Sequence, residues 1–233
     1  MNLIRYAPIA FLLAAVAGAH AQDATKAPYP AMAPIAQYRI ASRDDEIALA
    51  RSAGPPAIAA AADVLVLGEH GYETAVKGNN GFVCIVERSW ADGFEDVEFW
   101  NPKVRSPNCF NAPAAKAVLA QYLKRTEWVL AGVPLEEMIR RTQVALADKT
   151  FVDPAPGAMC YMLSAQGHLN DRAGHWMPHV MVYVPRAPAA LWGANQKSSP
   201  IVALDATDLD PVTVYLIPVQ HWSDGTPAPD HAK

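Results

Sequence analysis

Residues 63–87 have the sequence DVLVLGEHGYETAVKGNNGFVCIVE and carry the clearest strand pattern of the chain. Short runs rich in valine, leucine and isoleucine alternate here with glycine and asparagine, which favour tight turns. The pattern predicts three consecutive strands in an antiparallel meander, with the bounds Val64–Leu67, Tyr72–Lys77 and Gly81–Glu87.

Helical patterns lie on both sides of this meander. Ser42 and Asp45 have the spacing of a capping box and predict a short N-terminal helix. Apolar residues recur at helical spacing from about Asn111 to Ala131 and again from Pro134 to Leu146. Because only a short glycine-containing link separates the last two helices, they are predicted to form an αα-hairpin.

The last third of the chain returns to strand patterns. The predicted strands are Ala158–Ser164, His179–Val184, Ile201–Leu204 and Val212–Val219. Pro218 lacks a backbone donor, which favours an edge strand or the end of a strand. The fold class is therefore α+β: an antiparallel sheet of five to seven strands, with the αα-hairpin and the short N-terminal helix packed on one face.

The segment 88–111 is aromatic-rich and is predicted to be irregular, since Pro102 and Pro107 interrupt it. A long loop of this kind either packs over a core or forms a binding surface. Both interpretations remain open from the sequence.

The ends of the chain define the expected domain organisation. Residues 1–21 have the charged start, apolar stretch and small-residue cleavage site of a secretory signal peptide. We expect a flexible leader at 22–39, a single globular domain at 40–222 and a polar tail at 223–233. The expected location is the periplasm or the extracellular medium, without a membrane anchor after signal cleavage.

Composition excludes some classes of function. The 233 residues are 52% hydrophobic and 18% charged, which is typical of a globular chain. Since 19 Lys and Arg face 23 Asp and Glu, the net charge is −4, and no basic cluster occurs. A nucleic-acid partner is therefore not expected.

Three cysteines predict one disulfide and one free thiol in an oxidising compartment. Cys84 lies in a predicted strand and Cys109 in a turn-rich segment, and a bond between them closes a modest interval. Cys160 then stays a buried, unreactive thiol, because the sequence shows no base beside it.

The candidate site is centred on two histidines. His175 and His179 are the one local pair that could bind a metal, with His221, His168 or His70 as a third ligand. Copper or zinc would suit imidazoles near methionine sulfurs. On the strand that begins at His179, alternation places His179, Met181 and Tyr183 on one face, and the predicted ligand pocket comprises Trp176, Tyr161 and Tyr183.

Three functional hypotheses follow, and the residues leave open whether the protein is an enzyme. The first is non-catalytic binding of a small molecule or transition metal near His175 and His179. The second is a metal-dependent or histidine-assisted hydrolase, with His175 or His179 as the general base. No serine-nucleophile motif occurs, and Ser164 near His168 is of a kind common beside turns for backbone reasons. The third is an envelope interaction protein that uses the aromatic loop 90–100 as its contact surface. Oligomeric state is left open.

Several short motifs together resemble a family of exported bacterial proteins without an assigned function. They are Gly78–Cys84 followed by Trp90, Phe99–Pro102, Gly157–Met162 and Gly174–Trp176. The resemblance covers roughly residues 40–225 and implies export and a single compact domain. It implies no catalytic residue, substrate or cofactor.

Overall fold

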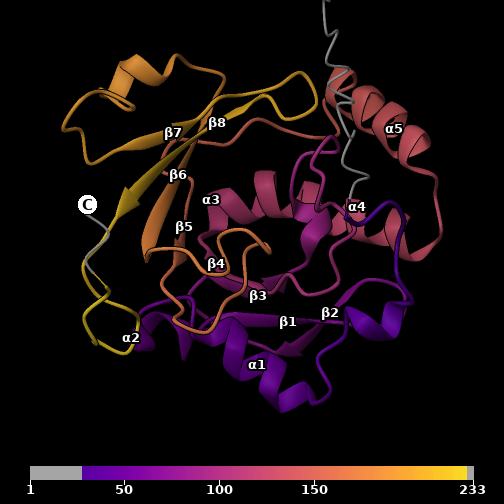
Figure 1. Cartoon of the computed structure of the whole chain (residues 1–233), viewed down its shortest axis with the longest axis horizontal. Helices are drawn as coiled ribbons and strands as arrows, with labels where there is room; N and C mark the ends of the chain where they lie inside the picture. The colour runs from indigo at the N-terminus through magenta and orange to yellow at the C-terminus, as the bar shows by residue number, and fades with distance from the viewer. Residues whose placement is uncertain (1–27, 230–233) are drawn as a thin grey trace, which may run out of the picture.

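The computed structural model describes residues 28–229, which form an α+β fold around one eight-stranded sheet (Figure 1). The strand order is β2-β1-β3-β4-β5-β6-β8-β7, which exceeds the predicted five to seven strands. The strands are β1 (Asp63–Leu67), β2 (Tyr72–Val76), β3 (Val83–Glu87), β4 (Ser106–Phe110), β5 (Met159–Met162), β6 (His179–Pro185), β7 (Val202–Leu204) and β8 (Val212–Pro218).

The predicted meander is wrong in its topology. β1 and β2 form an antiparallel hairpin, but β3 pairs with β1 in parallel rather than with β2. The connection between β2 and β3 crosses the start of β1, where a Cβ on Gly78 would lie 2.3 Å from the Ala61 carbonyl oxygen. Asp63 holds the crossing in place because its Oδ1 accepts a hydrogen bond from Gly78 N at 2.6 Å. Gly78 therefore allows a close crossing rather than a hairpin turn.

Helices cover both faces of the sheet, not one face as predicted. α1 (Arg43–Arg51) and α2 (Pro56–Ala59) pack with Val64, Cys84 and Val86 in a small core on one face. Ser42 caps α1 by accepting a hydrogen bond from Asp45 N at 3.3 Å.

The opposite face is covered by a continuous helical segment of α3 (Ala112–Ala114), a π-helical stretch η3 (Ala115–Leu119) and α4 (Ala120–Leu130). The sheet curves around this segment, while α5 (Leu135–Ala147) lies beyond α4 and away from the strands (Figure 1). The predicted αα-hairpin packed on the sheet is therefore not observed, because only its first helix covers the strands.

The segment 88–111 is more ordered than the sequence predicts. It contains the short 3-10 turn η2 (Ser89–Ala91) and the central strand β4, in which all five residues are buried. Trp90 is fully buried and its indole N–H donates to Thr126 Oγ1 at 2.9 Å. Phe94 and Phe99 also belong to the core. Of the two interpretations of this segment, the structure supports packing over the core.

The predicted leader, of which residues 28–39 are described, extends too far along the chain. Tyr38 is fully buried and donates to the Trp100 carbonyl oxygen at 2.7 Å. The domain therefore begins before residue 38, since this ring is part of its core. The predicted signal peptide lies outside the described residues. Within the described range, no helix is long and apolar enough to cross a bilayer.

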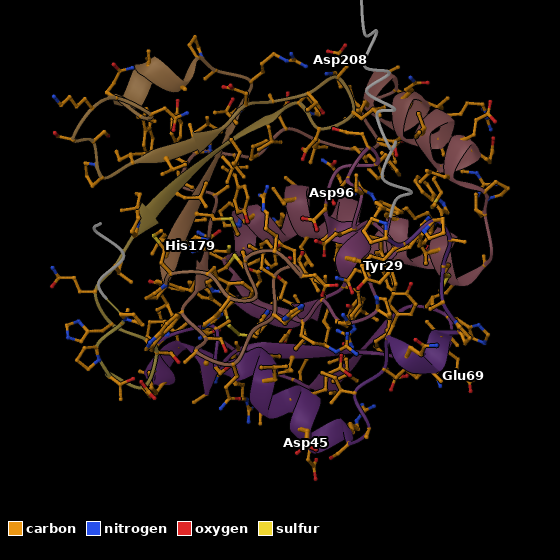
Figure 2. The ribbon with its side chains drawn as sticks, in the orientation of Figure 1. Tyr29, Asp45, Glu69, Asp96, His179 and Asp208 are labelled. Carbon is orange, nitrogen blue, oxygen red and sulfur yellow. A yellow bond between two sulfur atoms is a disulfide. The ribbon has the colours of Figure 1, made fainter. Side chains whose placement is uncertain are left out.

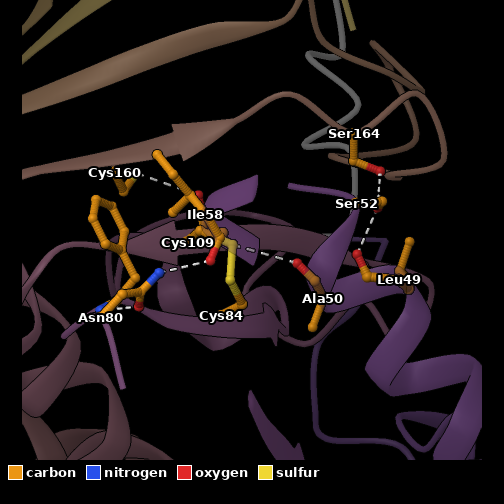
Figure 3. Close-up of a disulfide and its surroundings, with 11 residues drawn as sticks. Leu49, Ala50, Ser52, Ile58, Asn80, Cys84, Cys109, Cys160 and Ser164 are labelled. Carbon is orange, nitrogen blue, oxygen red and sulfur yellow. Dashed lines mark hydrogen bonds between the residues drawn. A yellow bond between two sulfur atoms is a disulfide. The ribbon is translucent and has the colours of Figure 1, made fainter. Parts of the chain in front are cut away.

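Cys84 and Cys109 form the predicted disulfide and lie directly opposite each other on β3 and β4 (Figure 3). The bond joins two neighbouring strands rather than a strand and a loop. Cys160 is a buried free thiol, as predicted.

Replacing both bonded cysteines with alanine is expected to lower the free energy of unfolding by about 3 kcal/mol. The bond closes an interval of 25 residues and so restricts the unfolded chain. Urea unfolding with and without dithiothreitol would measure the loss. The reductant should destabilise the wild type and leave the Cys84→Ala/Cys109→Ala variant unchanged. Equal unfolding midpoints for the oxidised wild type and the variant would contradict the prediction.

Candidate functional site

A cavity of about 630 Å³ lies between the concave face of the sheet and the α3–α4 segment. Its walls are mostly apolar, and this volume falls within the range of small-molecule sites. Val118, in the π-helical stretch, lines the helical side. Val202 and Leu204 of the edge strand β7 line the cavity and are also 44% and 53% exposed. They therefore mark an apolar opening beside β7.

Strand alternation determines which side chains reach the cavity. On β6, His179, Met181 and Tyr183 line it, whereas Val182 and Val184 pack in a separate core on the other face. This is the alternation expected from the sequence. Figure 2 shows His179 on β6.

The sheet side of the cavity carries a continuous chain of hydrogen bonds. The Asn108 amide donates to Glu87 Oε2, and the Cys160 thiol donates to Asn108 Oδ1 at 3.5 Å. Cys160 Sγ also lies 3.1 Å from the Tyr183 hydroxyl, which lies 3.9 Å from Met181 Sδ. Burial raises the pKa of the Cys160 thiol far above its usual range, so this sulfur is a hydrogen-bonding group rather than a nucleophile.

Glu87 is a buried carboxyl group whose surroundings favour the protonated form. Burial, reinforced by the nearby Asp92 carboxylate, raises the pKa of Glu87 to about 8. Burial and the neighbouring Asp96 raise the pKa of Asp92 to about 7. Asp210 also lines the cavity and burial raises its pKa, so three carboxyl groups of the cavity wall, at its polar end, retain protons at higher pH than usual.

Arg125 is the cation at this polar end. Its Nη1 donates to the carbonyl oxygens of Trp90 at 3.0 Å and Asp92 at 2.7 Å. Its guanidinium carbon lies 4.3 Å from the centre of the Phe94 ring, which is a cation–π contact. The guanidinium is therefore held in one orientation by the η2 segment.

The two central histidines of the predicted site both line the cavity. His179 Nδ1 lies 2.7 Å from the Met177 carbonyl oxygen, and since a carbonyl can only accept, Nδ1 carries the ring proton. Burial lowers the pKa of His179, so its Nε2 is an unprotonated acceptor at neutral pH. The His175 ring stacks on Trp222 with ring centres 4.9 Å apart.

The structure does not bring a third metal ligand to this pair. His221 is exposed and does not line the cavity. Across residues 28–229, no group of three or more His, Cys, Asp or Glu side chains is arranged to hold a metal ion. His168 instead lies 3.4 Å from Asp171, and His70 lines a separate shallow hollow. The histidine pair alone therefore offers two ligands at most.

The remaining predicted residues divide between the two faces. Trp176 and Tyr183 line the cavity, but Tyr161 points to the opposite face and stacks on Phe82. The Ser164 hydroxyl lies 2.7 Å from Ser52 Oγ and accepts from Gln166 N at 3.1 Å (Figure 3). It is engaged in fixing a turn, which is the ordinary role of such a serine.

Sequence reasoning missed the polar end of the cavity. Glu87 ends an otherwise apolar strand, and a carboxylate at that position was the available signal. Asn108 lies on the same face of β4 as Ser106 and Phe110, and all three line the cavity. The sequence predicts this segment to be irregular because of its prolines. Without β4, no local pattern joins Glu87 to Asn108.

The cavity cannot be interpreted by analogy with a relative. No family model, curated protein or solved structure matches this chain.

Proposed function

We propose that this protein is a non-catalytic binder of a small, largely apolar molecule, which occupies the cavity between the sheet and α4. The single observation that carries the proposal is the 630 Å³ cavity with its apolar walls. A pocket of this volume, with mostly apolar walls and a few polar groups, is the usual form of a small-molecule site. Its opening beside the exposed Val202 and Leu204 gives an apolar ligand a route of entry.

We place this binding activity outside the cytoplasm. The Cys84–Cys109 disulfide is compatible with an oxidising compartment, as is the predicted signal peptide. Periplasmic or secreted material is therefore the appropriate source for the experiments below.

The neutral dye N-phenyl-1-naphthylamine should bind the purified protein with a large rise in its fluorescence. Met181→Trp fills the cavity, so we expect this variant to weaken dye binding about tenfold or more. The matched control is Met159→Trp, because Met159 is also a half-buried strand methionine but does not line the cavity. A fluorescence titration of all three proteins measures the effect.

The control separates loss of the cavity from loss of the fold. Met159→Trp should bind the dye as the wild type does. Equal dye binding by wild type and Met181→Trp, or no saturable binding by the wild type, would overturn the proposed function.

A further inference from the structure

The Arg125 guanidinium is held by backbone carbonyls and an aromatic ring rather than by an ion pair with another described residue. Three backbone carbonyls, those of Trp90, Ala91 and Asp92, accept hydrogen bonds from its Nη1 alone. Phe94 covers one face of the guanidinium plane. These contacts involve Nη1 and one face of the guanidinium, and they include neither Nε nor Nη2.

The remaining Nε–Nη2 edge is a candidate ligand contact. Neither Nε nor Nη2 of Arg125 donates a hydrogen bond to another described residue. Arg125 lines the cavity, and none of the ion pairs found between residues 28 and 229 includes it. Two parallel N–H groups on a fixed guanidinium match the two oxygens of a carboxylate.

Three acids of the cavity wall act on the Arg125 charge, Asp210, Asp92 and Glu87, and burial raises the pKa of each, which favours their uncharged forms. Glu87 is held by the Asn108 amide, and its raised pKa reduces the negative charge that it would place in the cavity. The other arginine of the cavity wall, Arg88, is already paired with Glu46 at 2.8 Å. Arg125 forms none of the ion pairs found among residues 28–229, although Asp210, Asp92 and Glu87 lie near enough to act on its charge.

We propose that the ligand of the cavity is a monocarboxylic acid with an apolar tail, whose carboxylate binds the Nε–Nη2 edge of Arg125. The tail then lies along the apolar wall that includes Met181 and Leu216. This inference rests on the proposed function, because it names the head group of the molecule that fills the cavity.

The test compares three ligands with the same ten-carbon tail: decanoate, 1-decanol and decylamine. Each competes with N-phenyl-1-naphthylamine for the wild-type protein at neutral pH, below the micellar concentration. Decanoate should displace the dye at a concentration about tenfold or more below that of the other two.

Variants then locate the head group. Arg125→Met should weaken decanoate binding about 10- to 100-fold, whereas 1-decanol should change less than about threefold, which also shows that the variant is folded. Arg125→Lys keeps the charge but loses the two-pronged geometry and should fall between wild type and Arg125→Met. The matched control is Arg141→Met, because Arg141 also lies over an aromatic ring, that of Trp128, but does not line the cavity.

The outcomes separate the two proposals. If 1-decanol or decylamine displaces the dye as well as decanoate does, or if Arg125→Met binds decanoate normally, the carboxylate inference fails and the proposed function stands. If no ligand displaces the dye and the dye itself does not saturate, the proposed function fails with it.

Discussion

Arg88→Met is expected to lower the free energy of unfolding by about 3–5 kcal/mol, the range for breaking one partner of a buried ion pair. Arg88 is fully buried and pairs with Glu46, which is 4% exposed, at 2.8 Å. Its Nε also donates to the Tyr38 carbonyl oxygen at 2.7 Å. Glu46 in turn accepts from the backbone N–H of Leu67 at 3.1 Å. Removing the guanidinium leaves an uncompensated carboxylate inside the protein. It also removes the hydrogen bond that joins Arg88 to the N-terminal segment at Tyr38.

Urea unfolding followed by far-ultraviolet circular dichroism measures this loss. The matched control is Arg140→Met, since Arg140 pairs with Glu137 at 2.7 Å on the exposed surface of α5. Because solvent screens such an exposed pair, its removal should change the free energy of unfolding far less than removal of the buried pair. The double variant Arg88→Met/Glu46→Gln removes both charges and should recover part of the lost stability. A loss of less than about 1 kcal/mol for Arg88→Met would show that the buried pair is not a major determinant of stability.

Short-range patterns predicted the features that depend on neighbouring residues. The face of β6 that carries His179, Met181 and Tyr183 follows from strand alternation alone. The pairing of Cys84 with Cys109 followed from spacing and secondary structure. Each of these features is specified within a short stretch of chain, and the structure contains them.

Contacts between residues far apart in the sequence, such as the Glu46–Arg88 ion pair, were not predicted because no short stretch of sequence indicates them. Glu46 lies in the first turn of α1 together with Asp44 and Asp45, where the helix dipole favours acidic residues, so its position in the sequence indicates no distant partner. Its actual partner, Arg88, is 42 residues away. Strand β4 was missed because Pro107 argued against a central strand, although its missing N–H does not prevent pairing opposite Val86.

The candidate site was missed in part for the same reason. The histidine side of the cavity comes from one segment of chain, and the sequence located it. The polar end combines Glu87 of β3, Asn108 of β4 and Arg125 of α4, which only the folded topology brings together. A site built from three separate elements has no sequence spacing to detect.

Glu87→Gln is expected to remove most of a pH-dependent loss of stability in the wild type. In the folded protein burial raises the pKa of Glu87 to about 8, whereas the unfolded chain has the ordinary value of 4.5. Between these values the folded state binds the proton and the unfolded state does not. The stability that the protonated group contributes is therefore complete below about pH 4.5 and is lost as the pH rises toward 8. The loss is on the order of 5 kcal/mol at most for this group.

Glutamine keeps the shape of Glu87 and can still accept from Asn108, but it does not titrate. Free energies of unfolding from urea titrations at pH 5, 6, 7, 8 and 9 should therefore fall steeply for the wild type and less steeply for Glu87→Gln. Some slope should remain, because the pKa of Asp92 is raised to about 7 and acts in the same direction. His179 acts in the opposite direction, since its lowered pKa costs stability as the pH falls. Glu136→Gln, at an exposed position of α5, should follow the wild type.

Parallel curves for wild type and Glu87→Gln would mean that Glu87 is ionised in the folded protein. The cavity would then present a carboxylate beside Arg125, and the guanidinium edge would no longer favour an anionic ligand.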